Sequence, residues 1–592
     1  MQNFNGRLTL IALAFIVISG LMIARLLSFQ FQLDPDIQQR LYDVAGVTSG
    51  QEVEYRPNRG LIYDRDGQVL AVNTLEYRIG ISPVALGVNR EEKRQVARDL
   101  ARILDLNEQE VYFSLLPDEV SGQYPRYISL KSPATLEEGA AIEDLDISGI
   151  VIEPIYRRDY TEEILMDQLL GFVSLDSVGF WGVEAHYQTE LAGQSRIEER
   201  AVDPLQISES INIRNGQDLV LTIDSDIQWV AQQVLAEAVE RENALGGTII
   251  VMDPETGEIL AMVSYPYWTL EEYNELPEDE KPIFNPAIRY MYEPGSIFKI
   301  VSAAIALDAN VGIDMNWTYF NRGCEEMGGV PICDSGNSPG NSDPLGETSF
   351  ALCLIRSLNT CTSTWNRDYI TRGIWYEYLK AFGFGLPTGV DMNSEVSGIV
   401  NLPGSSGFNE ANYLQTSFGQ GISVTPLQML VAANAVANEG VIYRPHIVQS
   451  FRDGDTVYEN RPTSVSRPIT AATAQQIMRL LVGAVEDPLG WGGLARVEGY
   501  TVAGKTGTAQ KIDGFSYSDT DSWASFIGFV PADDPQLSVI IMLDNPEGYW
   551  GSQTAAPVFG ELVSRLVVLL EIPPDNVRIE LISEGAQPYA RD

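Results

Sequence analysis

A serine and a lysine three residues apart, Ser296 and Lys299, form the first pair in this sequence whose types and spacing suit chemistry. Acyl transfer needs a nucleophile, a base that takes its proton, and donors for the developing oxyanion. Residues i and i+3 lie on one face of a helix, so the hydroxyl and the amine can approach each other. Pro294 and Gly295 fit a sharp turn just before that helix. An exposed lysine near a helix start gives the same pattern, so the pair needs support from elsewhere in the chain.

The shortage of other bases favours the lysine. Only two histidines occur, His186 and His446, and neither lies in a motif, which argues against a serine–histidine–aspartate triad. A lysine, with an ordinary pKa of about 10.4, accepts a proton at neutral pH only after burial or a neighbouring cation lowers that pKa. The chain has few lysines, and Lys299 alone follows a serine at this spacing. Lys299 is therefore the candidate base.

Two motifs further along the chain complete a set. They are Ser357 with Asn359, and a strand-like run of Lys505, Thr506, Gly507 and Thr508. Glycine within such a strand lets a substrate backbone approach closely. Either motif alone has little value, but Ser-x-x-Lys, Ser-x-Asn and Lys-Thr-Gly in this order are typical of serine acyltransferases that react with β-lactams. The three motifs together predict an acyl-enzyme on Ser296.

Segments outside the three motifs point to the same family. They are the stem-like run RGLIYDRDGQVLA at 59–71, Gly182-Val-Glu184, DPETGEILAMVS at 253–264, SFGQGISVTP at 417–426, and Ala555-Ala-Pro557. On these segments and the three motifs, residues 50–575 resemble a class B penicillin-binding protein. Two stretches depart from the pattern, because 191–200 lacks an expected glycine and the cysteine-bearing loop at 324–333 is unusual. These departures concern local detail and leave the chemistry intact.

The resemblance implies a role for each residue of the first two motifs. Ser296 would attack the penultimate D-Ala carbonyl of a peptidoglycan stem pentapeptide and expel the terminal D-Ala. An amine on a neighbouring stem would then attack the ester. Lys299 would act as the base, and Ser357 would relay a proton to the leaving group. Asn359 would hold both the substrate amide and Lys299.

The third motif would bind the substrate terminus. Lys505, with Thr506, Gly507 and Thr508, would meet the substrate carboxylate, and the backbone N–H groups of Ser296 and Thr508 would form the oxyanion hole. The resemblance further implies inhibition by β-lactams and no cofactor. It also implies a multi-span membrane glycosyltransferase as partner.

The composition excludes several other functions. A net charge of −42 argues against binding nucleic acid, since a phosphate-binding surface needs clustered lysine and arginine. Two histidines and four cysteines leave little material for a metal site, and no calcium-loop pattern occurs, so we expect no metal. The sequence therefore favours an enzyme with an acidic, solvated exterior.

The four cysteines fall into two local pairs. Cys324 and Cys333 lie in a glycine-rich loop, whereas Cys353 and Cys361 bracket the motif around Ser357. The pairings Cys324–Cys333 and Cys353–Cys361 are the first to consider in an oxidising compartment. Buried free thiols remain an equal alternative, because the sequence gives no Cα distances.

An apolar segment near the N-terminus predicts a membrane anchor. Residues 8–24 are apolar except for Thr9 and Ser19, and residues 8–28 are long enough to span a bilayer as a helix. No small-x-small cleavage site follows, which favours an uncleaved signal anchor over a signal peptide. Arg7 and the amino terminus favour an inside start. We therefore expect a single-pass protein of the cell (inner or cytoplasmic) membrane, with its catalytic domain extracytoplasmic.

The remaining sequence predicts an α+β fold in several parts. We expect a cytoplasmic tip and anchor over 1–28, an elongated α+β pedestal of the dimerisation type over 29–210, a transpeptidase domain over 211–572, and a tail over 573–592. Strands at 247–252 and 258–264 lie near one end of the transpeptidase domain, and 523–530 and 537–543 lie near the other. Helical patterns lie between them, and 555–570 forms a closing helix. This order predicts one antiparallel sheet, flanked by helices and completed by the returning chain.

Other activities share some of these features. A bifunctional class A enzyme needs a glycosyltransferase domain, for which the region before residue 211 shows no pattern. A β-lactamase uses the same motifs but needs neither anchor nor pedestal. A non-catalytic β-lactam sensor or scaffold is a further alternative, opposed by the lack of a sizeable cytoplasmic segment. The segments Tyr292-Glu-Pro-Gly-Ser296 and 526–535 look more like the septal type of class B penicillin-binding protein than the elongation type. The elongation type remains the alternative.

Overall fold

The computed structural model describes most of the chain after residue 50. The described residues are 22, 51–55, 57–86, 89–117, 122–161, 168–174, 176–200, 214–268, 272, 275–277, 285–513 and 516–583. Within these ranges no helix has the length and apolarity needed to cross a membrane. The predicted anchor at 8–28 lies outside the described residues, except for Met22.

The chain forms two compact units, Met1–Pro57 with Gly193–Asn215, and Asn58–Ala192 with Gly216–Asp592. In the first unit, β1 (Gln51–Tyr55) pairs antiparallel with β8 (Arg196–Arg200). The second unit contains all three motifs of the predicted site.

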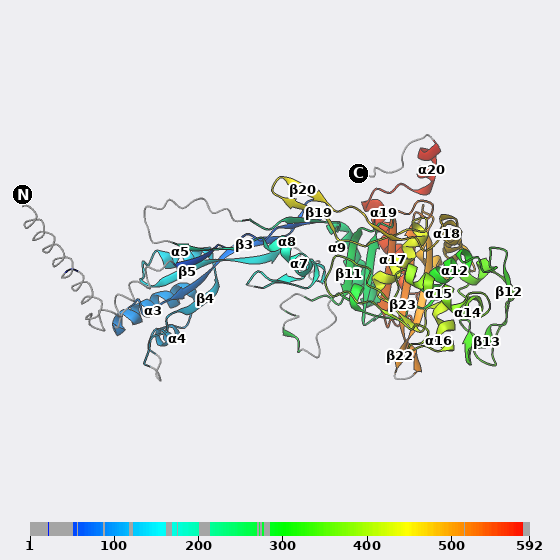
Figure 1. Cartoon of the computed structure of the whole chain (residues 1–592), viewed down its shortest axis with the longest axis horizontal. Coiled ribbons are helices and arrows are strands. Elements are labelled where there is room, and N and C mark those ends of the chain that lie inside the picture. The colour runs from blue at the N-terminus through cyan, green and yellow to red at the C-terminus, as the bar shows by residue number, and fades with distance from the viewer. Residues whose placement is uncertain are drawn as a thin grey trace, which may run out of the picture. The chain divides into compact units, whose positions relative to one another are not determined.

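The N-terminal part of the second unit is an α+β layer (Figure 1). The long strand β3 (Val69–Ile81) pairs antiparallel with β4 (Ile128–Ala134) on one side and with β5 (Ile150–Tyr160) on the other. Helix α3 (Arg90–Leu104) packs on this sheet through a small apolar core of its own. The shorter elements here are α4 (Glu108–Ser114), α5 (Leu136–Glu143), β6 (Phe172–Val173), β7 (Gly179–Phe180), α7 (Gly182–His186) and α8 (Gln188–Ala192).

A buried ion cluster joins two sequence segments that the resemblance singled out. Glu184 is fully buried, and Arg59 and Arg158 each donate from Nε to one of its carboxylate oxygens at 2.7 Å. Breaking such a buried pair by removing one partner typically costs about 3–5 kcal/mol. These ion pairs therefore hold the stem-like run at 59–71 and the Gly182-Val-Glu184 segment together.

One mixed sheet connects this layer to the C-terminal part of the unit. Strand β2 (Ile62–Tyr63) pairs antiparallel with β3 and parallel with β9 (Asp218–Leu221), which continues to β19 (Val448–Asp453) and β20 (Thr456–Glu459). The sheet thus joins strands from both sides of residue 211. Strands β18 (Ile442–Tyr443) and β21 (Ser464–Ser466) form a separate pair.

The C-terminal part is built on a five-stranded antiparallel sheet. Its order is β11 (Ile259–Tyr265), β10 (Gly246–Met252), β24 (Leu537–Asp544), β23 (Ser516–Val530) and β22 (Ala503–Asp513). The returning strand β24 lies between β10 and β23, with Ile540 opposite both Ile250 and Ile527. The predicted sheet, completed by the end of the domain, is therefore confirmed.

Helices cover both faces of this sheet (Figure 1). Because successive strand residues point to opposite faces, Ile249 and Val251 pack with α9 (Ser225–Arg241) and α19 (Ala555–Leu569). Ile250 and Met252 belong to the larger core of the other face, which includes α12 (Lys299–Asp308), α17 (Pro426–Ala437) and α18 (Ala471–Glu486). The central strands are buried on both sides, which gives the site a rigid base.

Smaller elements fill the space around these helices. They are α11 (Pro286–Arg289), β12 (Thr318–Asn321), β13 (Cys324–Met327), β14 (Val330–Cys333), β15 (Gly346–Ser349), α13 (Phe350–Ile355), α14 (Asn359–Asp368), α15 (Arg372–Ala381), β16 (Ile399–Val400), α16 (Glu410–Gln415), β17 (Ile422–Ser423), α20 (Asp575–Ser583), and the 3₁₀ turns η1 (Gly295–Phe298), η2 (Thr416–Phe418) and η3 (Gly493–Ala495). Helix α20 forms inside the predicted tail and is held by Arg578, which donates to Asp533 and Asp575.

Candidate active site

The three predicted motifs meet at one pocket of about 560 Å³. Ser296, Ser357, Asn359, Thr506 and Thr508 line it. The two lysines lie beneath its floor, with Lys299 fully buried and Lys505 2% exposed. Seven of the eight predicted residues thus line the pocket or lie directly under it.

The remaining predicted residue, Gly507, faces away from the pocket. Alternation along β22 turns it toward the body of the domain, where an added Cβ would collide with the Ser525 hydroxyl and lie 2.9 Å from Ile297 Cγ2. We expected this glycine to admit a substrate backbone. Its structural effect is instead to let the turn that carries Ser296 pack closely against the strand.

Ser296 lies in the 3₁₀ turn η1, directly before α12. The α-helical spacing expected from the sequence is thus replaced by three residues per turn, which aligns i and i+3 directly. Gly295 adopts φ +57° and donates its N–H to Gly419 O at 3.0 Å. A Cβ at this position would lie 2.7 Å from Thr508 O. Glycine is therefore needed both for the backbone conformation and for contact with β22.

Lys299 Nζ lies among four oxygen atoms of the first two motifs. It is 2.7 Å from both Ser357 O and Asn359 Oδ1, 3.1 Å from Ser296 Oγ, and 3.2 Å from Ser357 Oγ. The two nearest oxygens can only accept hydrogen bonds. A neutral amine has two N–H bonds, which satisfy these two acceptors and leave its lone pair for a serine hydroxyl. The geometry therefore suits Lys299 as a proton acceptor for either serine.

The electrostatics of the site favour that neutral amine. Burial, and after it the neighbouring Lys505 ammonium, hold the pKa of Lys299 well below its usual value, while Asp334 opposes them. Burial lowers the pKa of Lys505 to about 7. Lys505 therefore loses its proton near neutral pH, and the lowered pKa of Lys299 favours its neutral amine far more than that of an exposed lysine.

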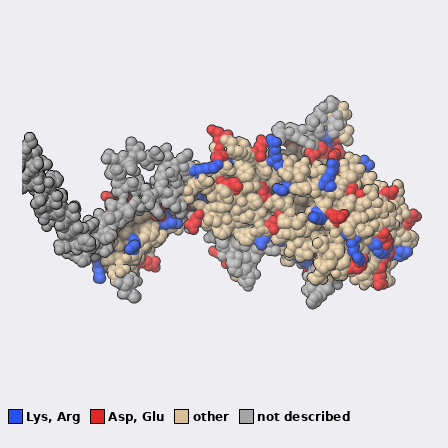
Figure 2. Space-filling view, viewed as in Figure 1, with Lys and Arg blue, Asp and Glu red and all other residues tan. Residues whose placement is uncertain are grey.

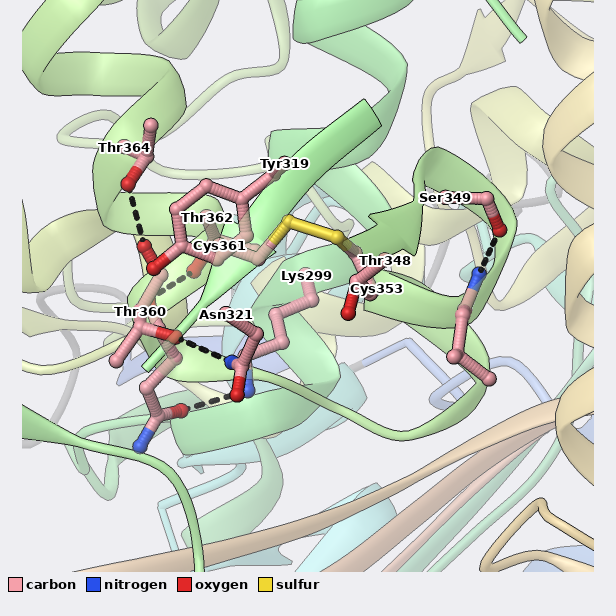
Figure 3. Close-up of a disulfide and its surroundings, with 12 residues drawn as sticks. Lys299, Tyr319, Asn321, Thr348, Ser349, Cys353, Thr360, Cys361, Thr362 and Thr364 are labelled. Atoms are coloured by element: carbon pink, nitrogen blue, oxygen red, sulfur yellow. Dashed lines mark hydrogen bonds between the residues drawn. A yellow bond between two sulfur atoms is a disulfide. The ribbon is translucent and has the colours of Figure 1, made fainter. Parts of the chain in front are cut away.

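A disulfide fixes the Ser357–Asn359 segment. Cys353 on α13 and Cys361 on α14 are bonded, with their Cα atoms 6.0 Å apart, so the bridge spans the motif (Figure 3). Ser357 between the two helices has φ +58°, a left-handed conformation that costs a non-glycine residue free energy. The bridge holds the two helix ends that impose this conformation.

The second pair of cysteines is also a disulfide, Cys324–Cys333. It closes the hairpin formed by β13 and β14, a structure that the glycine-rich sequence did not indicate. Cys333 O accepts a hydrogen bond from Asn359 Nδ2 at 2.9 Å. The hairpin thereby orients the Asn359 amide so that its oxygen faces Lys299. Of the two alternatives for the cysteines, the structure has both disulfides.

Sequence reasoning missed a buried polar network behind Asn359. Asp334, 5% exposed, accepts from Thr360 N at 3.0 Å, from Thr360 Oγ1 at 2.9 Å, and from Asn321 Nδ2 at 2.6 Å. Asn321 also donates to Thr360 Oγ1 at 3.0 Å, a hydrogen bond that is drawn in Figure 3. These bonds fix the first turn of α14, and the carboxylate offsets the nearby lysine charge. Only the position of Asp334, directly after Cys333, linked it to the site in the sequence.

Comparison with known proteins agrees with this geometry. The family described as "Penicillin binding protein transpeptidase domain" matches residues 247–564, and "Penicillin-binding Protein dimerisation domain" matches residues 54–221. The chain is a class B penicillin-binding protein. The first domain match contains all three motifs, and the second contains the buried cluster around Glu184.

The sequence alignments with individual relatives extend over most of this penicillin-binding protein. It is 29% identical to Stage V sporulation protein D of Bacillus subtilis, over 92% of this chain and 83% of that protein. It is 28% identical to the probable peptidoglycan D,D-transpeptidase PbpC of Pseudomonas aeruginosa, over 98% of this chain and 97% of the relative. The crystal structure of penicillin binding protein 3 from Mycobacterium tuberculosis, complexed with aztreonam, superposes with a TM-score of 0.67 at 26% identity, covering 88% of this chain and 98% of that one.

Proposed function

We propose that this penicillin-binding protein is a peptidoglycan D,D-transpeptidase that cross-links stem peptides through an acyl-enzyme on Ser296. The contact of Lys299 Nζ with both serines and with the two carbonyl oxygens of the second motif carries the proposal. As Ser296 Oγ bonds to the penultimate D-Ala carbonyl carbon, its proton passes to Lys299. The C–N bond then breaks, and the departing D-Ala amine takes a proton through Ser357.

The second half of the reaction reverses these roles. An amine of a neighbouring stem peptide attacks the ester carbonyl and loses a proton toward Ser357 and Lys299. Ser296 regains its hydrogen as the new amide forms. Lys505, Thr506 and Thr508 bind the carboxylate of the donor terminus, and backbone N–H groups of Ser296 and Thr508 stabilise the oxyanion. Every proton is passed between groups of the chain and its substrates, so the reaction balances without a cofactor.

A stem-peptide assay tests this function. The purified chain is expected to release one D-Ala per acylation from a pentapeptide ending in D-Ala–D-Ala, and to form a dimer when a second stem offers a free amine. Release of D-Ala is followed enzymatically and dimers by mass spectrometry. A chain that binds penicillin covalently yet never turns over a stem peptide would be the sensor or scaffold considered above, and the transpeptidase proposal would fail.

The cellular setting is part of the proposal. We place residues 1–28 as a cytoplasmic tip and single-pass anchor, 29–210 as the pedestal, 211–572 as the transpeptidase domain outside the cell membrane, and 573–592 as the tail. A multi-span membrane glycosyltransferase would supply the glycan strands to be cross-linked. The septal-type segments favour division over elongation. On the face seen in Figure 2, lysine and arginine are interspersed with aspartate and glutamate over the described residues.

Protease protection tests the topology and localisation. Protease added to intact spheroplasts is expected to degrade nearly the whole chain, because only the short tip lies inside. A fluorescent fusion that retains residues 1–28 is expected at mid-cell during division. A protected C-terminal domain would contradict the outward orientation, and uniform sidewall fluorescence would transfer the role to elongation.

A further inference from the structure

The wall of the active-site pocket carries a cation that the transpeptidase reaction leaves without a role. Among the described residues lining the pocket, Asp334 and Arg356 alone carry a formal charge. Both carboxylate oxygens of Asp334 accept hydrogen bonds from Thr360 and Asn321, so that charge is engaged on the protein side. Arg356 belongs to none of the ion pairs formed within the described part of the chain. Besides Lys505 beneath the floor, which the proposed reaction assigns to the donor terminus, Arg356 is thus a second cation that a ligand in the pocket can reach.

Trp491 holds this guanidinium in place. Arg356 Cζ lies 5.4 Å from the centroid of the Trp491 ring, and Trp491 Nε1 donates to Arg356 O at 3.2 Å. Stacking on an indole attracts a guanidinium while leaving the N–H groups at its edge free for a planar acceptor. The pair is therefore preorganised as a cationic fork at the rim of the pocket.

The loop that presents Trp491 is itself well anchored. Gly492 N donates to Ala484 O at 3.0 Å, and Gly490 N donates to Asp487 O at 2.9 Å, which folds the loop back on the end of α18. A Cβ on Gly492 would approach Ala484 O to 3.0 Å. Trp491 nevertheless remains 48% exposed. A large aromatic side chain held rigidly, stacked on an unpaired arginine and left half in water, is typical of a binding surface.

We propose that Arg356, stacked on Trp491, forms a subsite for a side-chain carboxylate on the residue that precedes the D-Ala pair of the donor stem peptide. The position follows from the chain, because Arg356 adjoins Ser357, whose hydroxyl contacts the same lysine as Ser296. One residue of extended peptide spans about 3.3–3.6 Å, so the residue before the acylated D-Ala reaches the neighbouring wall. The inference rests on the proposed transpeptidase function and adds the class of donor that it prefers.

Charge makes such a subsite consequential. A chain with net charge −42 repels an anionic peptide at long range, but salt screens that repulsion beyond about 8 Å. A fixed arginine fork inside the pocket acts within that distance and can bind a carboxylate through two parallel hydrogen bonds. A carboxamide has the same shape and lacks the charge. The subsite should therefore distinguish acidic donors from their amides.

The test uses two stem pentapeptides that differ only in glutamate or glutamine at the third residue. For the unchanged enzyme, kcat/KM for D-Ala release should favour the glutamate peptide by roughly tenfold, equivalent to about 1.4 kcal/mol. The ratio should fall to about one in Arg356→Gln and remain intermediate in Arg356→Lys, which keeps the charge but loses the fork. Arg479→Gln removes an exposed arginine of α18 away from this pocket and should keep the full ratio.

Each other outcome overturns the inference. A ratio near one in the unchanged enzyme removes the preference, and an equal loss on both peptides in Arg356→Gln gives the arginine a structural role only. Because the ratio is taken within one preparation, partial unfolding cannot imitate its collapse. If the unchanged enzyme releases D-Ala from neither peptide while penicillin still labels Ser296, the transpeptidase proposal fails first, and this inference fails with it.

Discussion

Replacing Ser296 by alanine is expected to abolish covalent labelling of the chain by a fluorescent penicillin. The strained amide of a β-lactam resembles the D-Ala–D-Ala terminus, so attack by Ser296 opens the ring and forms an ester. The leaving amine stays tethered to the acyl group and blocks the next acceptor, which makes the adduct persistent. Gel fluorescence and intact mass measure the adduct directly, with complete loss expected in Ser296→Ala.

The matched control is Ser335→Ala, a serine that lines the same pocket without contacting Lys299. It should be labelled like the unchanged chain. Ser357 is the nearest alternative nucleophile, because its hydroxyl lies 3.2 Å from the same amine. If Ser296→Ala is still labelled, peptide mapping will show whether Ser357 reacts, and the assignment of all three motifs would have to be withdrawn.

The local part of this site follows from sequence because its geometry is local. Ser296 and Lys299 are three residues apart, and any helical turn brings them to one face. The apolar strands at 247–252 and 258–264 are also a short-range pattern, and the structure pairs them as β10 and β11. The 3₁₀ form of the turn follows from its packing against Thr508 and Gly419, which no local pattern encodes.

The rest of the site depends on contacts between distant loops. Asp334 meets Asn321 and Thr360 because the hairpin of β13 and β14 folds over α14, and none of these residues lies at a periodic or motif-like spacing. Trp491 reaches Arg356 from the far end of α18 in the same way. The residue types alone predict that polar groups buried in this region need hydrogen-bond partners. Which partners they find is determined by the fold.

Replacing Lys299 by alanine is expected to slow acylation by penicillin by about 10²–10⁴, the usual contribution of general-base catalysis. The alanine leaves Ser296 intact as a nucleophile but removes the lone pair that takes its proton. Ser357 O and Asn359 Oδ1 lose their donor at the same time. Stopped-flow acylation gives the rate, and Lys380→Ala, an exposed lysine on α15, serves as the control.

The pH dependence separates loss of the base from general damage. Acylation by the unchanged chain should rise with pH as Lys299 loses its proton, at a pKa well below that of an ordinary lysine. It should fall again as pH passes the Lys505 pKa of about 7, because the ammonium that binds the substrate carboxylate is lost. The profile of kcat/KM is therefore bell-shaped, since it reports the free enzyme.

In Lys299→Ala the rising limb should disappear, while the falling limb caused by Lys505 remains. A structural defect would instead lower the whole profile and keep its shape, and thermal melting shows independently whether the variant is folded. A folded variant with the unchanged rising limb would place the base elsewhere. Within the described residues of this pocket no histidine is available, and Asp334 is committed to Thr360 and Asn321, so such a result would also remove the physical basis assigned to the Ser296–Lys299 pair.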